Sequence, residues 1–515
     1  MGNSPYSKDS VRSGAWHYLL GRGAAGLAGF ATVVLLVRYM DIQGYAAFTA
    51  LSGLISFIGI LASLGMERTL SRYIPEARLE RSVKDLANLI WKTAFVRFAV
   101  TLVIVSLLGV FWSSFLSIFK DIQIPFFPKA LLCFIVAETL FQHFSSVFQA
   151  LVLQKTLTKI LIVQWAGRLA TIFIALVGDH YISLDESLWI MAVPEFFGVI
   201  VFIVVLLMHL NSLENNNQNT IKNSAHTQAS WPDWQVIIQT ARNNYGYLLL
   251  AAPPQPYFIK MVAAFFLSAE YVAAYGFFVS IAERIRQYIP LHFFYNLIEP
   301  VIVASYIQNR NFESLSYRCQ LLYKSNLILM VPAIAWIAVC GDATVSLITD
   351  GKFQGLSWIL VLVMVQLTIG SHVVLLQLIL NSIEKSEFLV YASTCALSVM
   401  MTLMLITVPF YPKWLLVGST VFSMVMNLYI IHKIKQLNYN YQPSWRMLRG
   451  VLLSGLLAFL VTYLGVLKFS AHLSNFSIST LSFISIMVVY GIALWKLNSI
   501  TRAEIDLVKS ALVKA

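Results

Sequence analysis

The chain has 515 residues, of which 58% are hydrophobic and 12% are charged, and its mean hydropathy is +0.73. A water-soluble protein of this length is rarely so apolar, so the composition excludes a string of ordinary soluble domains. The formal net charge of +12 does not indicate nucleic-acid binding, because the basic residues are distributed as in a membrane protein.

Apolar stretches long enough to cross a bilayer recur along the whole chain, since one crossing needs about 20 residues. These segments must be helical, because backbone groups in lipid find partners only within their own segment. We therefore predict an all-α polytopic membrane protein with about 14 transmembrane helices. In chain order the predicted spans are 14–39, 45–66, 93–118, 128–152, 160–178, 187–208, 245–267, 271–303, 322–340, 356–382, 388–409, 413–432, 447–467 and 476–496.

The loops predict the orientation and argue against an enzyme. Of the 36 basic residues, 24 lie in loops on the side of the N-terminus and 5 in the opposite loops, so both termini are predicted to be cytoplasmic. The basic loop 67–92 is predicted to lie as an amphipathic helix on the anionic inner leaflet, and the Asn-rich stretch 209–230 to be a flexible linker. No loop could hold a soluble catalytic domain. The four cysteines form no CxxC pair, and no metal or other cofactor is predicted.

The sequence repeats itself around that linker. Residues 44–48 (GYAAF), which open the second span, match residues 271–275 (YVAAY), which open the eighth, at an offset of 227. At the same offset Leu153-Gln154 falls on Leu380-Asn381, and Val163 falls on Val390. The matches predict two pseudo-symmetric six-helix bundles, a transporter arrangement with the site between the halves. The predicted domains are an N-terminal bundle (1–208), a cytoplasmic linker (209–244), a C-terminal bundle (245–437) and two additional helices with a cytoplasmic tail (438–515).

Charged residues inside the spans are candidates for function, because each costs roughly 2.5–3.5 kcal/mol on insertion scales. Basic residues outnumber acidic ones there, so a cavity that they share would concentrate anions, and the planar fork of arginine suits phosphate. The candidate diphosphate-binding residues are Arg22, Arg168, Lys260, Arg284 and Arg286, and the candidate ion-coupling residues are Glu138, Glu195 and Glu283.

Structural roles for these charges stay open. A basic side chain near a helix end can extend to the lipid head groups, which we expect for Arg38 and Arg97 and which is an alternative for Arg22 and Lys260. Arg168 and Arg284 lie deeper in their spans. For them the alternative is an internal ion pair, such as Arg284 with Glu138 or Glu195, and such a pair could open when substrate arrives.

Polar side chains also recur at helical spacing in the fourth and tenth spans. The stripes consist of Glu138, Gln142, Ser145 and Gln149, and of Gln366, Gln377 and Asn381. Such stripes could bind sugar hydroxyls or hydrogen-bond neighbouring helices. The candidate glycan-binding residues are Gln142, Ser145, Gln149, Gln366 and Gln377. His143 lies off the Glu138 face and is expected to be a packed or pore-lining side chain.

Prolines predict bends in two spans, because proline removes a helical hydrogen bond. Pro253, Pro254 and Pro256 lie in the seventh span and Pro290 in the eighth. The bends are either structural or part of a rocking motion between inward-open and outward-open shapes.

At Leu36–Phe48, Leu64–Arg68 and Arg72–Glu76 the chain resembles the Wzx-type polysaccharide flippases of the multidrug/oligosaccharidyl-lipid/polysaccharide exporter superfamily. The resemblance covers essentially the whole chain and is clearest over residues 14–92. It implies two bundles that turn an undecaprenyl-diphosphate-linked oligosaccharide (an O-antigen, capsule or exopolysaccharide repeat unit) from the inner to the outer leaflet of the bacterial inner membrane, with an ion gradient as the energy source. It also implies lipid-linked oligosaccharide, membrane lipids and polysaccharide assembly proteins as partners.

The resemblance to lipid II flippases, which carry cationic residues in the first, seventh and eighth spans, implies that Arg22, Lys260, Arg284 and Arg286 hold the diphosphate. Two other functions stay open. A multidrug cation antiporter of the same superfamily would usually carry an acidic first span, whereas the acid near this one is Asp41 at its outer rim. A membrane-embedded polysaccharide polymerase or ligase would typically need a large outer loop with catalytic basic residues, which this sequence lacks.

Overall fold

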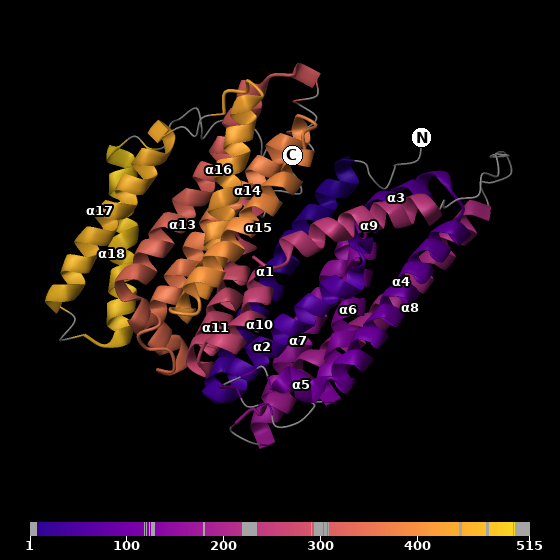
Figure 1. Ribbon diagram of the computed structural model, residues 1–515, viewed down its shortest axis with the longest axis horizontal. Coiled ribbons are helices and arrows are strands. Elements are labelled where there is room, and N and C mark those ends of the chain that lie inside the picture. Colours follow the sequence, from indigo (N-terminus) through magenta and orange to yellow (C-terminus); the bar gives the residue numbers. More distant parts are fainter. Residues whose placement is uncertain are drawn as a thin grey trace. The chain divides into compact units, whose positions relative to one another are not determined.

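The computed structural model describes residues 8–117, 119, 121–122, 124, 129–178, 181–218, 234–289, 291–292, 302, 306, 308–441, 445–469, 473–497 and 499 (Figure 1). All regular structure in these residues is helical, and eleven of the helices are long and apolar enough to cross a membrane. The prediction of an all-α polytopic membrane protein is therefore confirmed. The chain divides into two compact units, which we name unit 1 (Met1–Ala269) and unit 2 (Glu270–Ala515).

Three predicted spans are not among these eleven, each for its own reason. Only Gly23–Tyr39 forms the described apolar part of the first helix. The seventh predicted span is broken at its prolines into two helices, Trp234–Ala251 and Pro256–Phe266. The eighth is helical over Ala269–Arg286, and Pro290 lies outside the described residues. The total of about 14 spans therefore stays a prediction.

The described residues of unit 1 form nine longer helices and one short one. They are α1 (Lys8–Tyr39), α2 (Ile42–Ser63), α3 (Met66–Glu80), α4 (Val83–Val110), α5 (Trp112–Leu116), α6 (Lys129–Ala150), α7 (Gln154–Gly178), α8 (Leu184–Gln218), α9 (Trp234–Ala251) and α10 (Pro256–Phe266). Helix α6 is central, because it packs against α2, α3, α4, α7 and α8. Its aromatic residues Phe141, Phe144 and Phe148 form the middle of the core. Helix α1 packs on α7, and α10 packs on α2.

The basic segment after α2 does form an amphipathic helix, but its apolar face contacts protein. Leu70, Tyr73, Ile74 and Ala77 are buried in the unit 1 core, whereas Arg72 on the opposite face is exposed. Helices α3 and α9 lie side by side across one end of the unit (Figure 1). The prediction that this helix lies on the inner leaflet is therefore wrong for its apolar face, because that face is needed to close the core.

A tight turn joins α2 to α3, and only glycine fits its second position. Leu64 and Gly65 both adopt left-handed backbone conformations, with φ of 47° and 73°. A Cβ atom on Gly65 would lie 2.2 Å from the carbonyl oxygen of Ala241 and 2.7 Å from the backbone nitrogen of Tyr245, both in α9. The turn therefore sets how closely α9 approaches the α2–α3 junction.

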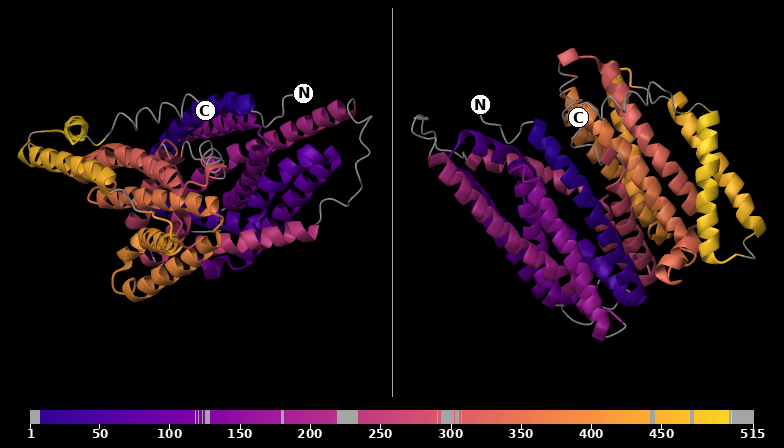
Figure 2. Two further views of the ribbon diagram at one scale, coloured as in Figure 1. Left: turned by 90° about the horizontal axis from the view of Figure 1, so that it is seen from above. Right: turned by 180° about the vertical axis from the view of Figure 1, so that it is seen from behind.

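Unit 2 contains seven α-helices and one 3₁₀ helix with described bounds. They are α11 (Ala269–Arg286), α13 (Phe312–Thr349), α14 (Ser357–Ser382), α15 (Glu387–Thr407), η2 (Pro412–Val417), α16 (Gly418–Gln436), α17 (Trp445–Phe469) and α18 (Asn475–Lys496). Helices α13, α14, α15 and α16 share one core. Helices α17 and α18 form a pair that packs on α13 through a second, smaller core (Figure 2). In that contact, Gly455 leaves room for Val331, whose Cγ1 lies 2.1 Å from where a Cβ would stand.

The two units contain the same local turn in corresponding places. After α6, Val152 has φ of 58° and the amide of Leu153 donates to the carbonyl of Phe148 at 2.9 Å. After α14, Glu384 has φ of 60° and the amide of Lys385 donates to the carbonyl of Leu380 at 2.9 Å. Both are helix ends of the Schellman type.

These turns correct the residue matches of the predicted repeat. Helices α2 and α11 begin 227 residues apart, at Ile42 and Ala269, as the first match requires. The turns, however, correspond at an offset of 232, from Leu153 to Lys385. The matches of Leu153 with Leu380 and of Val163 with Val390 are therefore wrong in register by five residues. Unit 2 has five more residues between the start of α11 and its turn than unit 1 has between the start of α2 and its turn, and a repeat with so few identical residues does not reveal such an insertion.

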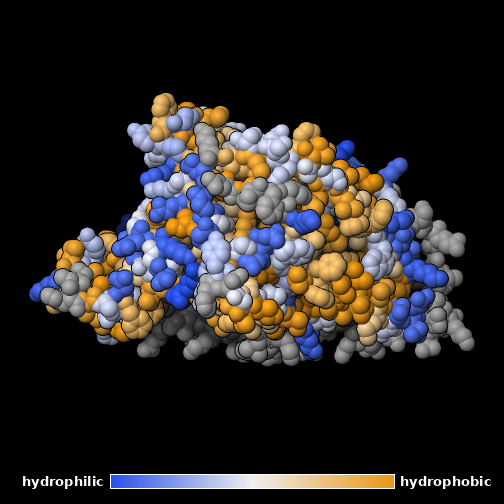
Figure 3. All heavy atoms as spheres, turned by 90° about the horizontal axis from the view of Figure 1, so that it is seen from below, coloured by the Kyte–Doolittle hydropathy of each residue, from blue (hydrophilic) through white to orange (hydrophobic). Residues whose placement is uncertain are grey.

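On the face drawn in Figure 3, hydrophobic residues cover broad areas interrupted by polar clusters, and many large apolar side chains of both units are exposed. On α4, for example, Phe95, Val103, Leu107 and Val110 are between 53% and 74% exposed. A row of this kind along one helix face is the surface that a membrane-spanning helix presents to lipid.

We expect Gly65→Ala to destabilise the protein, because the left-handed backbone alone costs roughly 1–2 kcal/mol for a residue with a Cβ and the methyl group would also meet α9. Gly109→Ala is the matched control, since a Cβ there meets nothing within 4 Å. The thermal unfolding midpoint in detergent should fall for Gly65→Ala and stay near the wild-type value for Gly109→Ala. Equal midpoints for the two variants would contradict this account of the turn.

Candidate functional site

Arg97 on α4 is the largest fully buried side chain among the described residues of unit 1. Its guanidinium donates to Glu67 Oε1 on α3 at 2.9 Å, to Gln142 Oε1 on α6 at 3.2 Å and to the carbonyl of Gly59 on α2 at 3.3 Å. The expectation that Arg97 reaches the lipid head groups is therefore wrong. Its side chain is 0% exposed and turns inward, because three helices supply acceptors there.

Gln142 continues the network along α6. Its amide nitrogen donates to Glu138 Oε1 at 2.6 Å, one helical turn away. Gln142 therefore accepts from Arg97 with its oxygen and donates to a carboxylate with its nitrogen. A Cβ on Gly59 would stand 3.1 Å from Gln142 Oε1, so the glycine also makes room for this contact.

Arg168 on α7 forms a second ion pair, with Glu195 on α8, and here both partners are buried. The two side chains are 4% and 1% exposed. Gln164 also donates to Glu195 Oε1 at 3.5 Å, and the Arg168 guanidinium lies 4.1 Å from the centre of the Trp165 ring. The sequence had named an ion pair as the alternative role of the deep arginines, and for Arg168 the structure has one.

The two ion pairs belong to one polar network. Glu195 lies close enough to Glu138 for the two carboxyl groups to interact electrostatically, and Glu195 Oε2 is buried without a hydrogen-bond partner among the described residues. A continuous series of polar groups thus runs through unit 1, and we name it the unit 1 network: Glu67, Arg97, Gln142, Glu138, Glu195 and Arg168. His143 is fully buried beside it and lies within the field of Arg97.

The charges of this network nearly cancel. With every group ionised, two arginines and three glutamates leave one negative charge. One proton taken up by a carboxyl group makes the sum zero.

Lys260 is also buried in unit 1, at 8% exposure on α10. It lies where α10 approaches α2 most closely. A Cβ on Gly53 would be 2.5 Å from the carbonyl oxygen of Tyr257 and 3.1 Å from Lys260 Cβ. This glycine therefore allows the backbone of α10, the short helix that begins at Pro256, to pack directly on α2.

Three predicted residues lie together at the end of α11 in unit 2. Arg284 is half-buried, while Glu283 and Arg286 are exposed. Both arginines lie in the last turn of the helix, where positive charge is favoured by the helix dipole. Arg22 lies on α1, and its side chain is outside the described part of the structure. The convergence of the five basic residues on one cavity therefore stays a prediction.

The predicted glycan stripes differ in their surroundings. In α6, Gln142 is held by the unit 1 network, whereas Gln149 is exposed and contacts Ser145 Oγ at 3.5 Å. In α14, Gln366 and Gln377 are half-buried, and Gln366 Oε1 is shielded from solvent without a hydrogen-bond partner among the described residues. Sugar binding stays a prediction for all five glutamine and serine residues.

Unit 2 contains a buried polar cluster that the sequence did not reveal. His372 on α14 contacts Asn427 Oδ1 at 2.7 Å through Nδ1 and the Tyr441 hydroxyl at 2.9 Å through Nε2. Asn427 donates from its own nitrogen to the carbonyl of Ile369, so its oxygen faces the histidine and Nδ1 carries the proton. The Tyr323 ring lies 4.7 Å from the imidazole ring. This cluster holds Tyr441, which follows α16, inside the unit.

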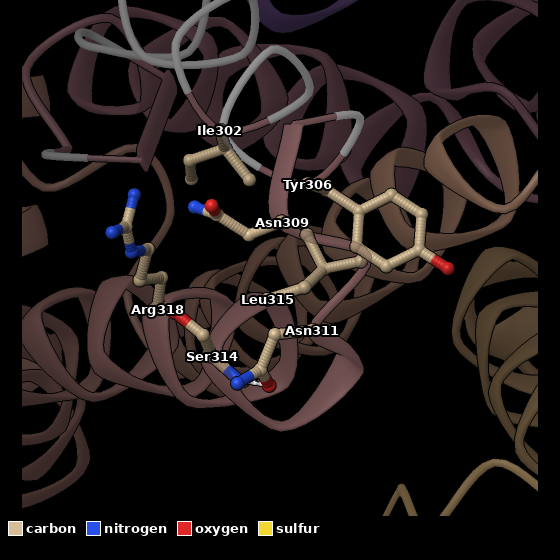
Figure 4. A pocket seen from close by; sticks show the side chains of 7 residues that line it. All are labelled: Ile302, Tyr306, Asn309, Asn311, Ser314, Leu315 and Arg318. Carbon is tan, nitrogen blue, oxygen red and sulfur yellow. Dashed lines mark hydrogen bonds between the residues drawn. The ribbon is translucent and has the colours of Figure 1, made fainter.

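A small cavity of about 130 Å³ lies at the start of α13, lined by polar side chains that include Asn309, Ser314 and Arg318 (Figure 4). Arg318 and Asn309 extend toward each other, while the Tyr306 ring points away (Figure 4). Ligand sites for molecules of moderate size usually measure about 300–1,000 Å³. The cavity is therefore too small for an oligosaccharide.

Comparison with known proteins agrees with this architecture. The family described as "Polysaccharide biosynthesis protein" matches residues 11–230. The fold is similar to that of the lipid II flippase MurJ in its inward closed conformation, with a TM-score of 0.66, 14% sequence identity, and coverage of 92% of this chain and 97% of that one. It is also similar to a mutant of the Vibrio cholerae MATE transporter VcmN, with a TM-score of 0.52, 14% identity, and coverage of 84% and 97%.

No curated protein sequence matches the chain significantly. The chain therefore matches one family over its N-terminal part, and its fold matches the structures of a lipid II flippase and of a MATE transporter. Together they show that the chain has the fold of these two proteins and that its N-terminal part matches this family, in agreement with the resemblance of the sequence to the multidrug/oligosaccharidyl-lipid/polysaccharide exporter superfamily.

Proposed function

We propose that this protein is a flippase for an undecaprenyl-diphosphate-linked oligosaccharide, which it moves from the inner to the outer leaflet of the bacterial inner membrane by alternating access. The observation that carries the proposal is the fold, which over 92% of the chain is similar to that of a lipid II flippase. The match of residues 11–230 to a polysaccharide biosynthesis family favours a glycan cargo. The repeat unit of an O-antigen, capsule or exopolysaccharide has this chemistry.

The proposal includes the predicted topology. About 14 spans form bundles over 1–208 and 245–437, joined by the linker 209–244 and followed by two helices and a cytoplasmic tail in 438–515. The corresponding turns after α6 and α14 support a repeated architecture. Both termini are then cytoplasmic, as the distribution of basic residues requires.

The diphosphate is proposed to bind to basic residues in two groups. Arg284 and Arg286, with Arg22, hold it in the inward-open state, and Arg284 is the best candidate because it is half-buried, so that a charge-assisted hydrogen bond there is less weakened by water than at exposed Arg286. Lys260 and Arg168 set the positive field or bind in the outward-open state. Arg168 can take that role only when its pair with Glu195 opens.

Coupling to an ion gradient is proposed to use the unit 1 network, with a proton as the ion. Glu138 and Glu195 are two carboxyl groups that interact electrostatically. Glu195 is paired with Arg168, and Glu138 accepts a hydrogen bond from Gln142, which in turn is bonded to Arg97. One proton changes the charge of the network between minus one and zero. Glu283, which is exposed at the end of α11, is the less suitable candidate, because solvent weakens its influence on other charges.

The sugars are proposed to contact polar side chains whose hydrogen-bonding groups are not all used by neighbouring helices. Gln149, Ser145, Gln366 and Gln377 are the candidates, whereas Gln142 is held by Arg97 and Glu138. The candidate cargo-binding residues are mostly basic, which favours an anionic cargo over the cationic drugs that an antiporter carries. Transport of a lipid-linked oligosaccharide without efflux of cationic drugs would separate the two functions.

Arg284→Ala is expected to lower the initial rate of oligosaccharide translocation in proteoliposomes about ten- to hundredfold, because a hydrogen bond to a charged group contributes roughly 1.5–3 kcal/mol. The control is Lys385→Ala, which removes a charge that is 44% exposed in the same unit. Normal translocation by Arg284→Ala at equal protein content would remove this residue from the mechanism.

Glu195→Gln is expected to abolish the response of the translocation rate to an imposed pH gradient, because glutamine cannot take up the proton. Some translocation that does not depend on the gradient should remain. Glu270→Gln, which alters an exposed acid in the first turn of α11, should leave the response intact. A sodium gradient at equal pH forms the second arm. Wild-type transport driven by sodium and not by protons, or an unchanged pH response of Glu195→Gln, would refute the proton site.

Arg168→Gln should destabilise the protein strongly, because removing one partner of a buried ion pair costs about 3–5 kcal/mol. The double variant Arg168→Gln/Glu195→Gln should recover much of the loss, since two neutral amides of similar shape can hydrogen-bond each other. Thermal unfolding of the three proteins in one detergent measures this. A double variant no more stable than Arg168→Gln would show that the pair is not the source of the effect.

A further inference from the structure

An open groove on the surface of unit 1 combines a lysine with three large aromatic rings. Trp91, Lys92, Phe95 and Val96 of α4 line it together with Trp234, the first residue of α9, and it has a volume of about 430 Å³. On α4 the residues are four apart in two pairs, 91 with 95 and 92 with 96, so they form adjacent rows of one helix face. No residue of the unit 1 network lines this groove.

The aromatic rings of the groove are held by the core. Trp91 packs edge to face on Phe144 with 6.0 Å between ring centres, and Phe144 is 2% exposed. Lys92 Nζ lies 5.0 Å from the centre of the Trp234 ring, a cation–π distance. The lysine is exposed and therefore keeps its charge available to a ligand.

The position of the groove along α4 identifies its surroundings. Phe95 is 70% exposed, and beyond it Val103, Leu107 and Val110 continue an exposed apolar row to the end of the helix. On the other side of Lys92, the first turns of α4 carry Lys84 and Asp85. Tryptophan and lysine at the boundary between a charged and an apolar segment are typical of the level where lipid head groups meet acyl chains.

We propose that this groove binds one anionic glycerophospholipid, with its phosphate at Lys92 and an acyl chain along Phe95 and Val96. The charge of Lys92 complements a phosphate, and the apolar row of α4 continues in the direction that an acyl chain takes. A basic side chain at the surface contributes roughly 1 kcal/mol to the binding of an anionic lipid. The bound lipid would join α4 to the start of α9, since Trp234 forms one wall.

The test is lipid binding by the purified full-length protein in detergent, measured by native mass spectrometry and by the shift of the thermal unfolding midpoint. Dioleoylphosphatidylglycerol is compared with dioleoylphosphatidylcholine, which has the same chains and no net charge. The wild type should bind phosphatidylglycerol more strongly. Lys92→Gln should reduce that preference about fivefold, the factor that corresponds to one surface charge, and Trp234→Ala should weaken the binding of both lipids.

Lys84→Gln is the matched control, because it removes an exposed positive charge from α4 two turns before the groove. It should keep the wild-type preference. Glycerol phosphate, the head group without chains, should not stabilise the protein. An unchanged preference in Lys92→Gln, an equal loss in Lys84→Gln, or stronger binding of a polyprenyl diphosphate than of phosphatidylglycerol at this groove would overturn the proposal. These measurements do not involve transport, so they stand or fall separately from the flippase proposal.

Discussion

A guanidinium group that leaves water for the interior of a membrane protein needs a carboxylate and several hydrogen-bond acceptors in one place. Unit 1 buries two such groups, Arg97 and Arg168. Arg97 takes acceptors from α2, α3 and α6, whereas Arg168 pairs with Glu195 on α8 and lies against the Trp165 ring of its own helix α7. Six helices are thus fixed by polar contacts whose loss would leave a charge without a partner, and such a loss is far more costly than the loss of one apolar contact.

The remaining features of unit 1 make these contacts possible. Gly59 leaves room for Gln142, and the turn at Gly65 brings α3 back across the unit so that Glu67 reaches Arg97. The apolar face of α3 is consumed in closing the core, which is why this helix is not free to lie on a lipid surface. The glycine turn and the basic amphipathic helix look independent in the sequence, but together they place the Glu67 carboxylate beside the buried Arg97.

The sequence predicts much of the fold because long apolar segments leave few choices of secondary structure. It also predicts a bend at Pro253–Pro256, and for Arg168 it leaves open an ion pair as the alternative to diphosphate binding. The burial of Arg97 was not predicted, because the predicted span 93–118 places this residue near a helix end, whereas α4 begins ten residues earlier, at Val83. A signal did exist: Thr93, Arg97 and Thr101 are spaced by four, which places them on one helix face, and all three are buried. The cluster of His372, Asn427 and Tyr441 joins segments 55 and 69 residues apart in sequence, and no periodicity encodes such a contact.

The energies involved constrain how the proposed cycle could work. A pH difference of one unit supplies about 1.4 kcal/mol per proton, whereas separating a buried ion pair by removal of one charge costs about 3–5 kcal/mol. One proton gradient of ordinary size therefore cannot break the Arg168–Glu195 pair by force. In the proposed cycle it can act only if protonation of Glu195 removes the attraction first, so that Arg168 leaves a neutral partner and meets the anionic cargo as its new counter-ion. The order of events follows: proton before phosphate for Arg168, and an unchanged Arg97, whose three acceptors keep the rest of the unit together while the pair opens.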